Sequence, residues 1–476
     1  MNILLISFYD DNFGDMLIRT CFRALLTVVL ENLGIGTDDV VHSSMHIKDI
    51  DEQRVCSSDL IFFAGGAMFG VNNLRTLDHI EAVTAIADER DIPVVFSSLG
   101  LNHMEDTDEN TARLNAVLRR PCVRAMSVRE NAEVFAPFTT GCSYPVLPVC
   151  DPAVWTRYLY DEDIRCARRD KPDHPIIGIN VVRGGLFTAN GRNWNIEKEE
   201  DYLLSLSSVL EMSGIDYRFY TNGSFLDNNT MGHFARKLEH ADDRFVYPDS
   251  TREVIRAIAS FDAVVAIRMH SSIIAYSLGV PSLNLIWNDK IPPFYRNIGY
   301  PDRAIELSDS DRVPELVNRL LADTDYHPDS DYMMSLYRFL FDTLCAILCQ
   351  SGEIYPFEQV CDRMRALSPP DSEDVTDYRT KLQRGKYCYL TLFNISQNRK
   401  YEIKELRRQL RRSEIRLQKL NTRLSFTQDK LDSTKQSLKK KSAEAARYKQ
   451  QLDRIYHLFP VRVYRWLRQR LHRRAT

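Results

Sequence analysis

The stretch of sequence that decides the fold is Asp262–Ile286, which reads DAVVAIRMHSSIIAYSLGVPSLNLI. Its apolar run Ala263–Ile267 predicts a buried strand, and residues 271–278 predict a helix that Gly279 ends. The run Ser282–Ile286 predicts a second strand. A strand, a helix and a further strand in this order are the repeating unit of a parallel sheet with helices on both faces.

The same alternation extends from the first residues of the chain to about residue 365. Further strands are predicted at Ile3–Ser7, Leu60–Ala64, Pro93–Ser97, Val123–Ser127, Ile176–Val181, Tyr217–Tyr220 and Phe245–Tyr247. Helices are predicted between them at 15–32, 74–89, 201–213, 229–239 and 252–260. The charged segment Asp161–Pro175 divides this pattern and is predicted to be a connector. We therefore expect an α/β fold of two doubly wound Rossmann-like domains, whose ligands bind in the crevice outside the carboxyl ends of the strands.

Five regions are predicted along the chain. They are an N-terminal Rossmann-like domain at 1–158, a C-terminal Rossmann-like domain with trailing helices at 175–365, a linker with a short helix at 366–398, a coiled coil at 399–458 and a basic amphipathic tail at 459–476. The apolar helices expected at 311–365 either cover the second domain or cross back to the first.

Composition is typical of a globular protein of a reducing compartment. Hydrophobic residues make up 44% and charged residues 27% of the 476 residues. No basic segment precedes the first apolar run, so no secretory signal is expected, and the longest apolar stretches carry charges, so no membrane span is expected. The ten cysteines contain no CxxC motif. We expect buried thiols in the cytoplasm and no metal site.

Charge divides the chain into an acidic body and a basic appendage. Of its 62 Lys+Arg and 65 Asp+Glu, 24 and 7 lie from Arg399 onward, a net charge of +17; the remaining 38 and 58 give −20. The appendage begins with a run that lacks Pro and Gly and repeats apolar residues every seven positions. These are Ile403, Leu410, Leu417, Leu424, Leu431, Leu438, Ala445 and Leu452. The d positions are poorer, so a homo-oligomeric coiled coil competes with a single solvated helix and with folding on a partner.

The final segment interleaves apolar and basic residues. It has six arginines and no acid, with Phe459, Val463, Trp466 and Leu467 among them. This pattern favours an anionic membrane surface, which would place a cytoplasmic protein peripherally on the inner face of the plasma membrane. The alternative is a frayed, solvated tail. No nucleic-acid-binding module is recognisable, so no nucleic acid is expected.

The most informative polar residues follow the strand Ala263–Ile267. Arg268 and His270 stand at its carboxyl end, where Ser271 or Ser272 can cap the next helix. Backbone N–H groups at a helix start, together with an arginine, form an anion site, and a histidine there can transfer a proton near neutral pH. The alternative for the arginine is a structural ion pair.

Strand ends of both domains offer further candidates. Asn12, Gly14 and Asp15 follow Ile3–Ser7, and Asn12 and Asp15 either cap the next helix or, for Asp15, face the cleft. Gly65 and Gly66 follow another strand and allow the backbone to approach a ligand. The segment that follows Ile3–Ser7 contains no GxGxxG motif, so a dinucleotide site is disfavoured. In the second domain, Arg183 offers a second positive charge or is a solvated turn residue.

Motifs in these places resemble the polysaccharide pyruvyltransferase family over about residues 1–300. They are Asn12-x-Gly14-Asp15, Gly65-Gly66-x-x-Phe69, Asp151-Pro152-Ala153, Gly178-Ile179-Asn180 and Arg268-Met269-His270-Ser271 with Gly279-Val280-Pro281. The resemblance implies two domains arranged like those of B-type glycosyltransferases. It also implies transfer of a pyruvyl group from phosphoenolpyruvate to a sugar as a ketal, in exopolysaccharide or cell-wall polysaccharide or a lipid-linked precursor. The coiled coil and the tail lie outside it.

The resemblance assigns roles to individual residues. Arg268 and His270 match the family's phosphoenolpyruvate-binding and proton-transfer positions, on the second domain, and the first domain then binds the acceptor. We expect His270 to be the general acid and Asp15 the base, with no metal or cofactor besides phosphoenolpyruvate as co-substrate. The expected substrate-binding residues are Arg268, Ser271, Ser272, Arg183, Asn12, Gly14, Gly65, Gly66 and Asn180.

Two other functions remain as alternatives. One is a nucleotide-sugar-dependent glycosyltransferase or epimerase on the same architecture. Such enzymes often carry a ribose-binding glutamate five residues before the glycine of the GxP turn, where this chain has Ile274. The other is an inactive domain kept as a scaffold on the coiled coil, against which the intact Arg268 and His270 argue.

Overall fold

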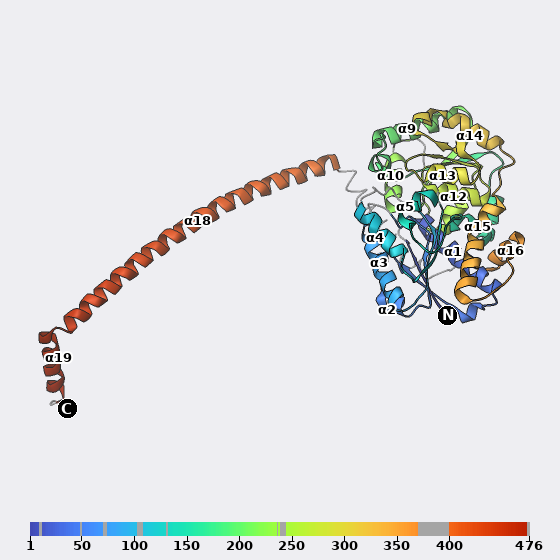
Figure 1. Ribbon diagram of the computed structural model, residues 1–476. Helices are drawn as coiled ribbons and strands as arrows, with labels where there is room; N and C mark the ends of the chain where they lie inside the picture. Colours follow the sequence, from blue (N-terminus) through green and yellow to red (C-terminus); the bar gives the residue numbers. More distant parts are fainter. Residues whose placement is uncertain are drawn as a thin grey trace. The chain divides into compact units, whose positions relative to one another are not determined.

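The computed structural model describes residues 1–8, 12–47, 50–69, 74–101, 108–129, 132–235, 237–238, 244–369 and 399–473. The chain divides into two compact units, Met1–Tyr387 and Cys388–Thr476, and each is described by itself (Figure 1). Nearly all of the predicted linker at 366–398 lies outside the described residues.

The first unit begins with a parallel sheet of six strands in the order β2-β1-β3-β4-β5-β6. These strands are β1 (Asn2–Ser7), β2 (Val41–His46), β3 (Leu60–Ala64), β4 (Val94–Leu99), β5 (Val123–Val128) and β6 (Val146–Pro148). The chain passes from β1 outward to β2 and returns to β3 on the other side of β1. The topological switch point, where open α/β sheets bind ligands, therefore lies between the carboxyl ends of β1 and β3.

The second sheet is also parallel and has the order β12-β11-β10-β7-β8-β9. Its strands are β7 (Ile176–Asn180), β8 (Asp216–Tyr220), β9 (Phe245–Val246), β10 (Ala263–Ala266), β11 (Ser282–Leu285) and β12 (Ala304–Ile305). Its switch point lies between β7 and β10, whose carboxyl ends carry Asn180 and Arg268.

Helices cover both faces of each sheet (Figure 1). On the first sheet, α3 (Leu74–Glu89) and α4 (Asp108–Leu118) pack on one face and α1 (Phe13–Asn32) on the other. On the second, α9 (Ile196–Met212), α10 (Phe225–Ala235) and α14 (Val313–Ala322) pack on one face, and α11 (Thr251–Ala259) and α12 (Met269–Leu278) on the other. Shorter helices are α2 (Glu52–Cys56), α5 (Ala136–Thr139), α6 (Thr156–Leu159), α7 (Asp161–Arg169), α8 (Leu186–Ala189) and α13 (Ile291–Asn297).

One hydrophobic core joins the two sheets. It contains residues of β1 and β3 from the first sheet, residues of β10 from the second, and the buried faces of α1 and α12. The short 3-10 helix Pro152–Trp155 contacts both α1 and α12, and the Trp155 side chain is fully buried. This shared packing holds the two helices that follow the switch-point strands against each other.

The trailing helices return to the first sheet. The helix α15 (Ser330–Leu348) contacts α1 and β5, and α16 (Phe357–Ala366) contacts α1 and α6. Of the helices expected at 311–365, α14 therefore covers the second sheet, whereas α15 and α16 cross back to the first domain. The boundaries proposed for the two domains, 1–158 and 175–365, stay a prediction.

The predicted fold class, two doubly wound Rossmann-like domains in a B-type arrangement followed by a long helix, is confirmed by the two parallel sheets and the C-terminal helix. The segment Asp161–Pro175, predicted as a connector, lies between the last strand of the first sheet and the first strand of the second, but it also contains the helix α7 at Asp161–Arg169, which was not predicted. Three strands were not predicted: β2, β6 and β12. All three lie at sheet edges, where a strand has one neighbour and less need of an apolar run.

The described part of the second unit, residues 399–473, forms α18 (Arg399–Tyr456) and α19 (Phe459–His472), with Pro460 in the first turn of α19. The long helix is therefore present as expected, whereas its association into a coiled coil stays a prediction. Within the described residues, no helix combines the length and the apolar character needed to span a membrane.

Candidate active site

The start of α12 carries the residues singled out at the end of β10. Arg268 is the N-cap of this helix, and all ten residues from Met269 to Leu278 are buried. Gly279 ends the helix with a φ of 70°, a left-handed conformation that glycine adopts without a Cβ clash. The strand, the turn, the helix and the glycine stop thus occur in the predicted order.

His270 lies in the first turn of α12 and faces the other domain. Its side chain is 10% exposed, and its Nδ1 is 4.0 Å from Oδ1 of Asp15 on α1. Its Nε2 is buried and has no hydrogen-bond partner among the described residues. Burial lowers the pKa of His270, and the carboxylates of Asp15 and Asp151 offset this only in part. The imidazole is therefore neutral at neutral pH, with a free ring nitrogen between two domains.

The start of α1 is docked directly against this imidazole. A Cβ on Gly14 would lie 2.3 Å from Nδ1 of His270, so only a glycine permits the approach. The backbone N–H of Phe13 donates to the carbonyl of Asn222, after β8, at 3.1 Å. The side chain of Asn12 caps α1 by accepting from the N–H of Gly14 at 3.1 Å. Of the two expected roles at this helix start, Asn12 therefore caps and Asp15 faces the histidine.

The guanidinium of Arg268 is held by a carboxylate that the sequence analysis did not single out. Its Nη2 and Nε donate to the two oxygens of Asp227 at 2.6 and 2.9 Å, and the Asp227 side chain is fully buried. The structural ion pair that was an alternative for this residue is thus present. The pair occupies one edge of the guanidinium, and the other N–H groups make no hydrogen bond to the described residues.

Ser271 and Ser272 do not cap α12, which has no side-chain cap, so that prediction is wrong. The Ser271 hydroxyl donates to Oδ1 of Asn222 at 2.6 Å. The Ser272 hydroxyl accepts from Asn284 at 2.8 Å and from Tyr295 at 3.0 Å. Ser271 thus connects the helix to the end of β8 and Ser272 connects it to β11 and α13, and their binding of substrate stays a prediction.

Asn180 organises the backbone at the switch point of the second sheet. Its Oδ1 accepts from the N–H of Arg268 at 2.9 Å, and its Nδ2 donates to Asn222 at 3.1 Å. Asn222 therefore receives hydrogen bonds from both Asn180 and Ser271, while its own Nδ2 is buried without a partner among the described residues. Asn222 lies two residues after the end of β8, so its position near a strand end is a signal that could have identified it.

The two glycines after β3 have a packing role. Their φ angles are 65° for Gly65 and 81° for Gly66, and a Cβ on Gly65 would lie 2.3 Å from Ile18 of α1. Gly65 therefore lets α1 pack closely on β3 near the site. A Cβ on Gly66 would be 3.2 Å from the ring of Phe8, so this turn also borders the end of β1.

The motif Asp151-Pro152-Ala153 starts a short helix and holds a buried ion pair close to His270. Asp151 caps the short helix at Pro152–Trp155 and forms a buried ion pair with Arg129 at 2.5 Å. Both charges act on His270, Asp151 raising its pKa and Arg129 lowering it. Arg183 joins the site through its backbone N–H, which donates to Asp227 at 2.8 Å.

Comparison with solved structures finds proteins of low sequence identity. UDP-GlcNAc 2-epimerase from Neisseria meningitidis is 10% identical with a TM-score of 0.46, covering 73% of this chain and 100% of that one. The epimerase from Methanocaldococcus jannaschii is 11% identical with a TM-score of 0.45, covering 71% and 98%. ADP-heptose LPS heptosyltransferase II from E. coli is 13% identical with a TM-score of 0.35, covering 68% and 99%.

Comparison at the level of sequence identifies the family. No curated protein matches the chain. The sequence model of the polysaccharide pyruvyl transferase family matches residues 12–289, which include α1, the switch point between β7 and β10, and the whole of α12. Because this match spans more than half of the 476 residues, the chain belongs to the polysaccharide pyruvyl transferase family.

Proposed function

We propose that this chain transfers a pyruvyl group from phosphoenolpyruvate to a sugar of a cell-surface polysaccharide or its lipid-linked precursor. The observation that carries the proposal is the buried His270, which has an unpartnered Nε2, faces Asp15 across the two domains and lies two residues from Arg268. An acid, a base and a cation at one point are what the reaction requires.

The donor is an anion at two positions, since it carries a phosphate and a carboxylate. The N–H groups of Arg268 that do not contact Asp227 are the side-chain donors available for one of them. The first turns of α1 and α12 meet at this point, and their dipoles favour negative charge. No metal or cofactor is needed to neutralise the donor in this scheme.

His270 delivers the proton. In the free protein its pKa is lowered by burial, and the negative charge of a bound donor raises that pKa again. The protonated imidazole then gives its proton to the methylene carbon of phosphoenolpyruvate, which becomes the methyl group. Asp15 accepts the proton of the sugar hydroxyl whose oxygen forms a bond to the adjacent carbon.

The second half of the reaction closes the ketal. The bond between that carbon and the phosphate oxygen breaks, and a second hydroxyl of the same sugar adds to the carbon and loses its proton. The products are the cyclic ketal and hydrogen phosphate, so two hydroxyl protons end on the methyl group and on phosphate. The first domain, which provides Asp15, is the acceptor side in this scheme.

A nucleotide-sugar donor is disfavoured by a particular residue. Ile274, at the position where a ribose-binding glutamate is expected in the alternative, is apolar and 1% exposed in the middle of α12. It offers no acceptor to a ribose hydroxyl.

The C-terminal unit adds an assembly and a location to the proposal. We infer that α18 joins copies of the chain into a homo-oligomer and that α19 binds an anionic membrane surface, so that a cytoplasmic enzyme works beside its lipid-linked acceptors. The exposed apolar residues of both helices support these two inferences.

The decisive experiment follows phosphate release from phosphoenolpyruvate in the presence of a panel of nitrophenyl and lipid-linked sugars. We expect release with at least one acceptor and none with His270→Ala. In a parallel thermal-shift series, phosphoenolpyruvate should raise the melting temperature and nucleotide sugars should not. Stabilisation by nucleotide sugars alone would favour the glycosyltransferase, and neither stabilisation nor turnover would favour the scaffold.

A further inference from the structure

One buried carboxylate links the two arginines proposed for the site, Arg183 and Arg268. Asp227 lies in the first turn of α10, and its side chain is fully buried. Its Oδ1 accepts from Nη2 of Arg268 and from the backbone N–H of Arg183, and its Oδ2 accepts from Nε of Arg268. The carboxylate therefore fixes the end of β10 and the turn after β7 in one arrangement.

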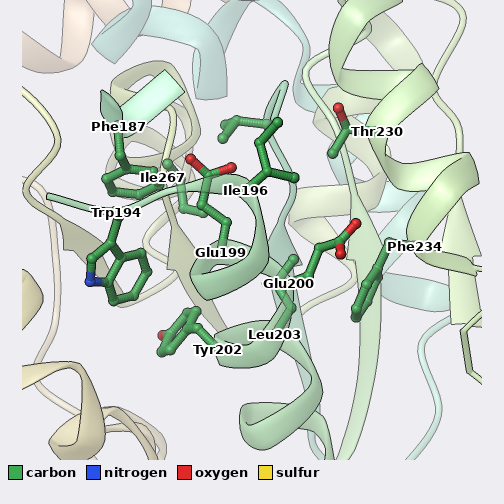
Figure 2. Close-up of a pocket in the computed structure, with 11 residues that line it drawn as sticks. Phe187, Trp194, Ile196, Glu199, Glu200, Tyr202, Leu203, Thr230, Phe234 and Ile267 are labelled. Atoms are coloured by element: carbon green, nitrogen blue, oxygen red, sulfur yellow. The ribbon is translucent and has the colours of Figure 1, made fainter. Parts of the chain in front are cut away.

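Three consecutive N–H groups in the turn after β7 donate hydrogen bonds to side chains. The N–H of Arg183 donates to Asp227, that of Gly184 to the hydroxyl of Thr230 at 2.9 Å, and that of Gly185 to Glu199 at 3.1 Å. Figure 2 shows Glu199 and Thr230 among the residues that line a small cavity bordering this turn. These N–H groups are thus already hydrogen-bonded, so an anion bound beside this turn depends on side-chain donors.

Arg268 is the side-chain donor that the geometry orients. Two parallel hydrogen bonds to one carboxylate fix both the position and the plane of a guanidinium. Its remaining N–H groups keep a constant direction, which lowers the entropy lost on binding an anion. The charge of Asp227 acts in the opposite sense, because a carboxylate beside the arginine weakens the attraction for any anion.

We propose that Asp227 is a positioning residue for phosphoenolpyruvate: it holds Arg268 in the orientation that binds the donor and fixes the turn at Arg183. This inference rests on the proposed function. It also predicts the direction in which the Kd for phosphoenolpyruvate changes when Asp227 is replaced. Loss of the orientation of Arg268 weakens anion binding, whereas loss of the carboxylate charge alone strengthens it.

The test measures phosphoenolpyruvate binding by calorimetry with the full-length protein. In Asp227→Asn, an amide nitrogen replaces one acceptor of the guanidinium, and we expect the Kd for phosphoenolpyruvate to rise by about 10- to 100-fold. Asp227→Glu keeps the carboxylate and should recover part of the affinity. An unchanged or lower Kd in Asp227→Asn, with the fold intact by circular dichroism, would overturn the proposal.

A matched control separates positioning from general destabilisation. Asp163 in α7 is also a buried carboxylate paired with two arginines, Arg252 and Arg256. Asp163→Asn should lower the melting temperature and leave the Kd for phosphoenolpyruvate unchanged. An equal loss of affinity in Asp163→Asn would mean that Asp227 acts only through stability.

A second readout does not depend on the donor. The Nε–H proton of Arg268, assigned by its disappearance in Arg268→Lys, should exchange slowly with water in the wild type and quickly in Asp227→Asn. If the wild-type protein does not bind phosphoenolpyruvate, the proposed function fails while this exchange still reports on the position of Arg268. Fast exchange in the wild type contradicts the positioning role whatever the donor is.

Discussion

At the scale of single residues, the reaction depends on one imidazole. His270→Ala should reduce turnover by about 10²-fold or more, because a positioned general acid contributes at least this factor. The fold should remain intact, since Nε2 of His270 has no partner to lose among the described residues. Phosphate release and circular dichroism check the two statements. His327→Ala, at an exposed histidine, is the control, and near-normal turnover of the His270 variant would contradict the assignment.

Gly14 is the second sensitive residue, because it has no space for a side chain. In Gly14→Ala, the new methyl group would meet Nδ1 of His270 at 2.3 Å, so either α1 or the imidazole must move. We expect turnover to fall by about 10²-fold, since displacement of a catalytic group by an ångström has this effect. Gly36→Ala, whose Cβ meets only the carboxylate of Asp39 at 3.1 Å, should keep full activity. Equal turnover of the two variants would show that the close contact between α1 and His270 is not needed for the reaction.

The lowered pKa of His270 makes stability depend on pH. The unfolded chain binds a proton at this histidine below its usual pKa of about 6.5, whereas the folded chain resists protonation until lower pH. The stabilisation is therefore present above that value and is lost as the pH falls through the lowered pKa. His270→Gln removes the part of the pH dependence of stability that comes from this histidine.

The measurement is the melting temperature at a series of pH values from 7.5 to 5. The wild type should lose more stability over this range than His270→Gln. His42, whose pKa burial lowers to about 4, contributes similarly in both proteins and cancels from the difference. Parallel curves for the two proteins would show that His270 is not held neutral by burial.

At the scale of elements, the limits of sequence reasoning follow from what each element buries. Strands with two neighbours, such as β3 and β10, are buried along their whole length and read as uninterrupted apolar runs. The edge strand β2 is only partly buried and has the sequence VHSSMH, which has no such run. The helix α7 was not predicted because its sequence is highly charged. Even its buried face includes a charged residue, Asp163, which pairs with arginines of α11.

The site shows the same limit. Arg268 and His270 were found because the carboxyl ends of strands can be located in a sequence, whereas Asn180 was found only through a motif that resembles the family. Asp227 was not found, since it lies in the first turn of α10 and only the packing of that helix brings it to Arg268. The prediction that Ser271 caps α12 was wrong for a related reason: a tertiary contact replaces the local one, because its hydroxyl donates to Asn222 after β8.

The helix α18 leads to a prediction on assembly. Its leucines at every seventh position have exposed fractions between 50% for Leu452 and 68% for Leu438, so the single chain leaves an apolar stripe without a partner. Burial of each leucine in an oligomer contributes about 2 kcal/mol, and polar d positions reduce the total. We expect the full-length chain to form dimers or trimers in sedimentation experiments.

A pair of variants tests the stripe itself. Leu424→Lys with Leu431→Lys places two charges in the stripe and should produce a monomer. Thr422→Lys with Gln436→Lys adds the same charge at positions outside the stripe and should leave the oligomer intact. A monomeric wild type at high concentration would leave a single solvated helix, and equal association of both variants would place the contact elsewhere.

At the scale of the whole molecule, charge and function are divided along the chain. The residues before Arg399 carry a net charge of −20 and include the whole match to the family, whereas the residues from Arg399 onward carry +17. An acidic body is repelled by an anionic membrane, so attachment requires a segment of opposite charge with apolar residues that enter the interface.

The helix α19 has the composition for this attachment. Tyr464 and Trp466 are 65% and 53% exposed, and Leu467 and Leu471 are exposed beside them. The guanidinium of Arg470 lies over the Trp466 ring at 4.3 Å, which leaves the ring able to enter an interface while the charge stays near headgroups. Each basic residue near an anionic surface contributes about 1 kcal/mol, and an oligomer presents several such helices to one surface.

The full-length chain should therefore sediment with vesicles that contain phosphatidylglycerol at low salt and be released at high salt, because screening removes the attraction. It should not sediment with neutral phosphatidylcholine vesicles. A chain that ends at Asn398 should stay in solution with both and still release phosphate with a water-soluble acceptor. Trp466→Ser with Leu467→Ser should weaken binding without a change in charge, which separates interfacial burial from electrostatic attraction. If the truncated and full-length chains distribute identically between vesicles and solution, α19 does not bind membranes. If the serine variant leaves the vesicles when RNA is added and binds the RNA, the helix would be assigned to nucleic acid instead.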